Sequence, residues 1–105
     1  MEELTLKQIQ KRIRDNKIKN GFNITDIGKD LLMLSEELGE AVKAYRKGNK
    51  DEVAEELVDL IIYCLGLMEI LEKDGYTEII KKIEKNEKRE YHVTKDGFHL
   101  REDQK

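Results

Sequence analysis

The chain has 105 residues, of which 41% are charged and 6% are aromatic, with a net charge of −3 and neither proline nor tryptophan. This length indicates one domain whose core is small enough that pairing with another copy would stabilise it. The composition is typical of long, solvent-exposed helices rather than of a sheet protein. Acids and bases alternate without forming a basic face, which excludes the usual nucleic-acid-binding surface. We therefore predict a single all-α domain over residues 1–105.

Cellular location follows from the one cysteine and from the pattern of charges. Cys64 has no partner for an internal disulfide and lies in an apolar segment, so we expect a reduced core residue. The N-terminal residues 1–4 lack a signal-peptide pattern, and acids interrupt the longest apolar stretch, residues 53–71. We predict a cytoplasmic protein that does not cross or bind a membrane.

The first two helices have clear start and stop signals. Thr5 with Gln8 three positions later is a capping-box pattern, and the helix that follows should end near Asn20 and Gly21. A second helix is predicted from about 27 to 47, ending at Gly48 with basic residues in its last turn.

The third and fourth helices are predicted on either side of a second turn. Asn49 with Glu52 forms another capping pattern, and the helix should reach about Lys73, closed by Asp74-Gly75. A fourth helix is expected over 76–89, which places the folded core at about 4–90. The tail, 91–105, is predicted to be either a small hairpin or disordered.

The predicted third helix is apolar over an unusually wide arc. One helix–helix contact cannot cover such a surface, so we expect this helix at the centre of a bundle, contacting neighbours in its own chain and in a second subunit. The fold prediction is thus a four-helix bundle-type protomer that dimerises or tetramerises through its central helices. Gly66, in the middle of the helix, would permit close approach of another backbone.

Carboxylates interrupt the apolar faces of the second and third helices. Asp59 lies within an apolar run, where burial of its charge is costly unless something compensates it. Glu56 precedes it by three residues on the same face. At about 100° per residue, Glu37 and Glu40 flank the core side of the second helix, and Glu36 lies further towards solvent.

An antiparallel packing of these two helices would bring the carboxylate pairs face to face. Four carboxylates so close cannot all stay ionised without a counter-charge. Hard oxygen ligands favour Mg²⁺ or Mn²⁺, with water or substrate phosphates completing the coordination. The competing interpretation is a solvated acidic face, since the chain has 23 acids and such strings arise easily by chance.

The same residues resemble the EExxE…ExxD motif of the all-α nucleoside triphosphate pyrophosphohydrolases, the superfamily of MazG-like proteins, dCTP pyrophosphatases and dimeric dUTPases. The strings are Glu36-Glu37-Leu38-Gly39-Glu40 and, fifteen residues later, Glu56-Leu57-Val58-Asp59. The similarity extends over about residues 25–100 and includes a Lys-x-x-x-Asn segment at 82–86. The compact MazG-like forms are most similar.

The resemblance implies metal-dependent hydrolysis between the α and β phosphates, giving a nucleoside monophosphate and pyrophosphate. It also implies a homodimer or homotetramer and a role in removing surplus or non-standard nucleotides. Glu36 or Glu40 would orient or deprotonate the attacking water. Tyr45, Tyr63 and Met33 are candidates for a base pocket. The implied metal ligands are Glu37, Glu40, Glu56 and Asp59, and the implied substrate-binding residues are Lys82, Lys85, Asn86 and Arg89.

Three other functions compete with this interpretation. A di-iron carboxylate bundle would supply histidines three residues after glutamates, but His92 and His99 both lie in the tail. A non-catalytic helical dimerisation module explains the wide apolar face but gives no reason for Asp59. A nucleotide-binding regulatory module would keep the site without useful turnover.

Overall fold

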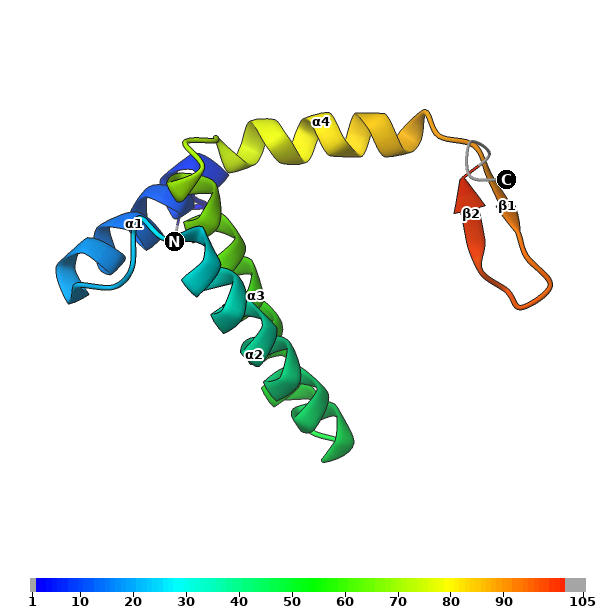
Figure 1. The fold of residues 1–105 in the computed structure, drawn as a ribbon, viewed down its shortest axis with the longest axis horizontal. Coiled ribbons are helices and arrows are strands. Elements are labelled where there is room, and N and C mark those ends of the chain that lie inside the picture. Colours follow the sequence, from blue (N-terminus) through cyan, green and yellow to red (C-terminus); the bar gives the residue numbers. More distant parts are fainter. Residues whose placement is uncertain (1, 102–105) are drawn as a thin grey trace.

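The computed structural model describes residues 2–101. It contains four helices followed by a two-stranded sheet (Figure 1), which confirms the all-α prediction. The elements are α1 (Leu6–Asn20), α2 (Ile27–Arg46), α3 (Lys50–Ile70), α4 (Gly75–Glu87), β1 (Tyr91–Val93) and β2 (His99–Arg101).

The start of α1 is fixed by the predicted capping box. The Thr5 hydroxyl accepts a hydrogen bond from the Gln8 backbone N–H at 3.1 Å, and the Gln8 side chain accepts one from the Thr5 N–H at 2.7 Å. The helix ends where predicted, at Gly21, whose φ of 69° places it in the left-handed region that favours glycine.

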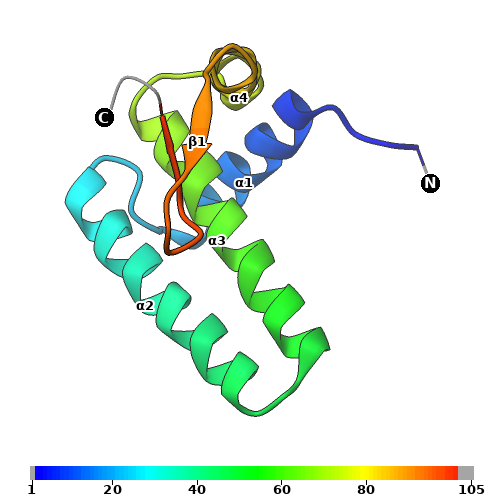
Figure 2. The ribbon, with the colours of Figure 1, turned by 90° about the vertical axis from the view of Figure 1, so that its right-hand side faces the viewer.

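Helices α2 and α3 form an antiparallel hairpin, whose two arms lie side by side in Figure 2. Asp26 caps α2 and Asn49 caps α3, each accepting a hydrogen bond from a backbone N–H three residues on. Ala41 and Ala44 are buried on α2, and their small side chains allow the two helices to approach closely. This hairpin is the part of the fold that positions the predicted site.

The junction between α3 and α4 differs from the prediction. Helix α3 ends at Ile70, not near Lys73, because Glu72 adopts a left-handed φ of 58° and its N–H donates back to the Glu69 carbonyl. The predicted stop, Asp74-Gly75, instead begins the next helix. The Asp74 carboxylate accepts a hydrogen bond from the Thr77 N–H at 3.1 Å and so caps α4, whose first residue is Gly75.

Helix α4 starts against α1 and then points away from the α2–α3 hairpin (Figure 1). Beyond it, β1 and β2 pair in antiparallel register, with Tyr91 opposite Arg101. Gly97, with a φ of 85°, completes the turn that joins them. The hairpin alternative for the tail is thus correct over 91–101, and the predicted tail residues 102–105 lie outside the described residues.

A single chain covers little of its apolar surface. The buried apolar side chains among residues 2–101 are those of Ala41, Ala44, Leu65 and Leu67. The radius of gyration is 16.8 Å, whereas a compact domain of this length would have about 13 Å. Four large apolar side chains of α3 are exposed to solvent, including Ile61 at 56% exposure; the others are Leu57, Val58 and Ile62.

Two expectations for α3 differ from the structure. Cys64, predicted to be a core residue, is exposed, because it lies on the face of α3 that the other helices of the chain leave uncovered. Gly66 approaches a side chain rather than a backbone: a Cβ at this position would lie 3.2 Å from the Lys17 Nζ. None of the helices among residues 2–101 combines the length and hydropathy required to span a membrane.

Candidate active site

Three of the predicted carboxylates converge between α2 and α3. Glu37 extends from α2, and Glu56 and Asp59 extend from α3. One carboxylate oxygen from each lies within 4.8 Å of the others. The antiparallel hairpin brings Glu37 opposite the i, i+3 pair, and such a pair lies on one helical face. This arrangement agrees with the predicted proximity for three of the four carboxylates.

The electrostatics of this cluster favour a bound cation. The pKa of Glu56 is raised first by burial, then by its side-chain hydrogen bond with Glu37, and then by the charges of Glu37, Asp59 and Glu40. Across residues 2–101, the ion pairs of the chain involve none of the three clustered acids. Because the like charges raise one another's energy and have no basic neighbour, a divalent ion with oxygen ligands fits here.

The remaining two predicted acids lie close to the cluster but outside it. Glu40 is near enough for its charge to raise the pKa of Glu56, yet it is not one of the three converging side chains. Glu36 lines a neighbouring groove. Asp59 itself is exposed in the single chain. Its place in an apolar run therefore reflects its position beside Glu56 and Glu37 rather than burial within one chain.

An open groove of about 1300 Å³ lies between α1 and the α2–α3 hairpin, next to the carboxylates. Met33 and Tyr63, both candidates for a base pocket, line it, and Glu36 lies along it as well. Tyr45, the third candidate, is 75% exposed near the end of α2 and is not among the lining residues. The groove is mostly apolar and large enough for a nucleoside.

Tyr63 connects the groove to the cluster electrostatically. Its pKa is raised first by burial and then by the negative charges of Glu37, Asp30, Asp59 and Glu36. A tyrosine phenol is already protonated at physiological pH, and the raised pKa of Tyr63 preserves its O–H as a hydrogen-bond donor at higher pH as well.

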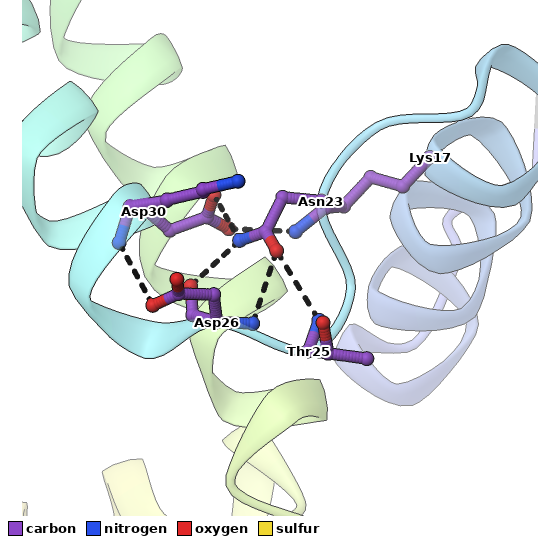
Figure 3. A network of polar contacts seen from close by, with 6 residues as sticks. Lys17, Asn23, Thr25, Asp26 and Asp30 are labelled. Atoms are coloured by element: carbon purple, nitrogen blue, oxygen red, sulfur yellow. Dashed lines mark hydrogen bonds and ion pairs between the residues drawn. The ribbon is translucent and has the colours of Figure 1, made fainter.

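A buried polar network at the groove was not predicted from the sequence. The Lys17 ammonium donates to Asp30 at 2.7 Å, and the Asn23 side-chain amide donates to the other Asp30 oxygen at 3.0 Å (Figure 3). Asn23 also accepts hydrogen bonds from the backbone N–H groups of Thr25 and Asp26. The network joins α1, the connecting loop and α2 and so sets one wall of the groove.

A signal for this network is present in the helical periodicity. Lys17 follows Leu6 and Ile13 at the spacing of one α1 face, and Asp30 precedes Leu34 and Ala41 at the same spacing on α2. Two opposite charges on facing apolar stripes predict a buried pair. The sequence does not show which acid pairs with Lys17, because Asp30 is 13 residues away and the path of the loop between them cannot be predicted.

The predicted substrate-binding residues, which lie on α4 and just after it, are not brought to the carboxylates of the same chain. In Figure 1, α4 leads away from α2 and α3 after its first turn. These residues are exposed or half-buried, and the Arg89 guanidinium donates to the Asn86 side-chain oxygen at 2.8 Å. The residues in question are Lys82, Lys85, Asn86 and Arg89.

Comparison with known proteins supports one family. The model of the MazG nucleotide pyrophosphohydrolase domain matches residues 29–94, which include both acidic motifs and α4. Comparisons with curated proteins and with solved structures gave no match. The match covers more than half of the chain and agrees with the helical hairpin and its converging carboxylates, so this chain belongs to the MazG nucleotide pyrophosphohydrolase family.

Proposed function

We propose that this chain hydrolyses nucleoside triphosphates between the α and β phosphates, releasing a nucleoside monophosphate and pyrophosphate. The observation that carries the proposal is the convergence of Glu37, Glu56 and Asp59 within 4.8 Å beside a groove of nucleoside size. The biological role would be removal of surplus or non-standard nucleotides in the cytoplasm.

The acidic cluster would hold Mg²⁺, or Mn²⁺, through Glu37, Glu56 and Asp59, with Glu40 as a fourth ligand. When bound, a divalent ion neutralises charge on the leaving pyrophosphate and lowers the pKa of a water molecule. Glu36 or Glu40 orients or deprotonates the attacking water. The proximity of Glu40 to Glu56 supports Glu40 in this role, and the position of Glu36 along the groove supports Glu36.

The groove would receive the nucleoside. Its apolar lining, including Met33, excludes water from the base, and the protonated Tyr63 hydroxyl offers a hydrogen bond to a base or sugar acceptor. Basic side chains on α4 and just after it would bind the phosphates, and Asn86 would contact the sugar or base. The phosphate-binding candidates are the exposed Lys82 and Lys85 of α4 and the half-buried Arg89, two residues beyond its end.

We infer that a second copy completes the site. Helix α4 of one chain points away from that chain's own carboxylates, so its basic residues could serve only the site of a neighbouring copy. The exposed apolar face of α3 supplies the surface on which two copies would pack. A homodimer is the simplest assembly that meets both requirements, and a homotetramer would repeat it.

The test is product analysis after incubation with a panel of canonical and modified nucleoside triphosphates, with and without Mg²⁺. We expect monophosphate and pyrophosphate only with the metal, and loss of activity by at least about a hundredfold in Glu37→Gln and Asp59→Asn. Glu55→Gln, an exposed acid on α3 outside the cluster, is the matched control and should keep full activity.

Three results of this assay would count against the proposal. Diphosphate and orthophosphate as products would show attack at the other bond. Equal activity in Asp59→Asn and Glu55→Gln would show that the cluster is not the active site. Absence of turnover over a broad panel, with folded protein, would favour a non-catalytic dimerisation or nucleotide-binding regulatory module.

Oligomeric state is tested separately by light scattering across a range of protein concentrations. Ile61→Glu places a charge in the exposed apolar face of α3 and should dissociate the assembly and abolish turnover. Lys50→Glu adds the same charge at the start of α3, where it suits the helix dipole, and should leave the assembly intact. A monomeric wild-type protein with full activity would overturn the proposed shared site.

A further inference from the structure

The junction of α1, α3 and α4 contains a buried amide that the proposed reaction does not use. Gln10 lies on α1 and is 3% exposed. Its side-chain nitrogen donates to the Glu69 carboxylate at 2.8 Å and to the Lys73 carbonyl at 3.0 Å. Its oxygen accepts a hydrogen bond from the Gly75 backbone N–H at 2.7 Å. One side chain thus ties the end of α3, the connecting turn and the first residue of α4 to α1.

Gly75 is matched to this side chain. A Cβ at position 75 would lie 2.6 Å from the Gln10 oxygen and 2.7 Å from the Leu65 Cδ2, closer than real Cβ contacts. Glycine therefore permits the backbone of α4 to approach the amide closely enough for the hydrogen bond. The contact is specific for an amide, because donor and acceptor are needed at opposite ends of the same group.

The contact lies at the first residue of α4, so a small change of angle there is amplified along the helix. Helix α4 packs mainly on α1 and then extends without support from α2 (Figure 1). At about 1.5 Å per residue, Asn86 lies about 16 Å along the helix from Gly75. A tilt of roughly 10° at Gly75 would move Asn86 by about 3 Å, which exceeds the ~1 Å misplacement that can lower a rate about a hundredfold.

We propose that Gln10 is a positioning residue that fixes the direction of α4 and so sets where the basic side chains of α4 are presented to the phosphates of the substrate. The assignment to phosphate binding rests on the proposed function. The clamp itself rests on the three hydrogen bonds of Gln10 and on Gly75.

The direct test is a distance measurement between α4 and α3 by double electron–electron resonance. Spin labels are placed at Glu84→Cys and Glu55→Cys in a Cys64→Ser background, and labelled chains are diluted with unlabelled ones so that only distances within a chain contribute. Gln10→Met should broaden or shift the distance distribution, and Gly75→Ala should do the same from the other side of the contact.

The matched control is Gln8→Met. Gln8 is the same residue type on the same helix and also makes a hydrogen bond, but to Thr5 rather than to the α3–α4 junction. Its loss destabilises the start of α1 and should leave the distance distribution unchanged. An unchanged distribution in both Gln10→Met and Gly75→Ala would overturn the inference whatever the activity of the protein.

The functional consequence is measured by binding, so that it does not depend on turnover. The probe is a nucleoside triphosphate with a methylene bridge between the α and β phosphates. Its Kd should rise about tenfold in Gln10→Met, as when one charged contact to phosphate is lost, while the Mn²⁺ affinity stays at the wild-type value. Equal analogue affinity in Gln10→Met and wild type, with altered distances, would reject the positioning role.

Gln10→Glu provides a rescue that a general loss of stability would not show. At neutral pH the new carboxylate has no hydrogen to donate to Glu69 or to the Lys73 carbonyl, so these acceptors lose their partner. Binding of the analogue should then be weak. At lower pH the protonated carboxyl can accept from the Gly75 N–H and donate one hydrogen bond where the amide donates two, so analogue affinity relative to wild type should recover in part. Tight analogue binding without hydrolysis by wild type would contradict the proposed function alone and would keep the role of Gln10.

Discussion

The two polar regions of this small protein differ in how their groups are satisfied. At the junction of α1 with α2 and α4, the buried polar side chains find partners within the chain: Lys17 pairs with Asp30, and Gln10 makes three hydrogen bonds. Between α2 and α3, three carboxylates meet with no basic partner among the described residues. Buried polar groups that are paired hold a fold together, whereas a cluster of like charges needs something from outside the chain.

The apolar surface shows the same contrast. Leu65 and Leu67, near the α1 end of α3, are buried, and Ile61 and Ile62 one turn earlier are exposed. At one end of the α2–α3 hairpin, the apolar side chains are thus covered by other helices of the same chain. The other end presents an acidic cluster and an apolar face together, the combination expected of a site that receives a metal, a nucleotide and a second copy.

The largest effect on stability is expected from a substitution in the region whose buried polar side chains are paired within the chain. Lys17→Met leaves the Asp30 carboxylate buried without its counter-charge and should lower the free energy of unfolding by about 3–5 kcal/mol. Lys11→Met removes an ion pair of the same 2.7 Å length that is exposed to solvent, and should cost less than about 1 kcal/mol.

Chemical denaturation of both variants measures this difference. Lys17→Met combined with Asp30→Asn removes the stranded charge and retains an acceptor for Asn23, so it should recover most of the loss. Equal effects of Lys17→Met and Lys11→Met would show that the Lys17–Asp30 pair is not buried in solution.

A smaller effect, of opposite sign, is expected from the unsatisfied region. The pKa of Glu56 is raised in the folded chain, first by burial and then by Glu37. At pH values above the pKa of Glu56 in the unfolded chain, the folded state therefore binds the proton more tightly than the unfolded state does. Stability without metal therefore falls as pH rises from 4.5 through the folded pKa. Glu56→Gln removes this loss and should raise the Tm of the metal-free protein at pH 7 but not below pH 4.5.

Thermal unfolding with a chelator, at a series of pH values, is the measurement. Addition of Mg²⁺ at pH 7 should make the Tm of wild type higher than that of Glu56→Gln, because wild type gains more stability from the ion. A variant that is less stable than wild type at pH 7 with chelator present would contradict the repulsion inferred at this site.

The smallest effect concerns the turn that joins α3 to α4, next to the contacts of Gln10. Helices α1 and α2 end with Gly21 and Gly48 in the left-handed conformation, whereas α3 ends with Glu72 at a φ of 58°. Glu72→Gly relieves this strain and should stabilise the protein by about 0.5–1 kcal/mol, net of the greater freedom of glycine in the unfolded chain. Glu72→Ala keeps the strain and should show no gain in a urea titration; equal stability of the two variants would argue against strain at this residue.

The sequence predicted the helices and the acidic cluster because both depend on local spacing. Capping residues such as Thr5 and Asn49 mark helix starts, and the i, i+3 pair of Glu56 and Asp59 lies on one face of any helix. The α3–α4 junction was misplaced because Asp74-Gly75 suits a helix end as well as a start. Only the strained φ of Glu72 decides between them, and spacing does not reveal it.

The partners of Gln10 and Lys17 could not be predicted for a different reason. Both lie on the apolar face of α1, which signals burial, but Gln10 bonds with groups 59 to 65 residues away. Such pairings depend on how α1 crosses the other helices. The position of α4 could not be predicted for the same reason, since it is set by the contact between Gln10 and Gly75 rather than by any property of α4 alone.

The most direct test of the central claim is Mn²⁺ binding, followed by electron paramagnetic resonance on wild type, Asp59→Asn and the control Glu55→Gln. If Glu37, Glu56 and Asp59 form the metal site, wild type and Glu55→Gln will bind Mn²⁺ with the same affinity, Mg²⁺ will compete, and Asp59→Asn will bind at least about tenfold more weakly. Binding that is equal in all three proteins, or absent from wild type, would contradict the assignment of this cluster as the catalytic metal site.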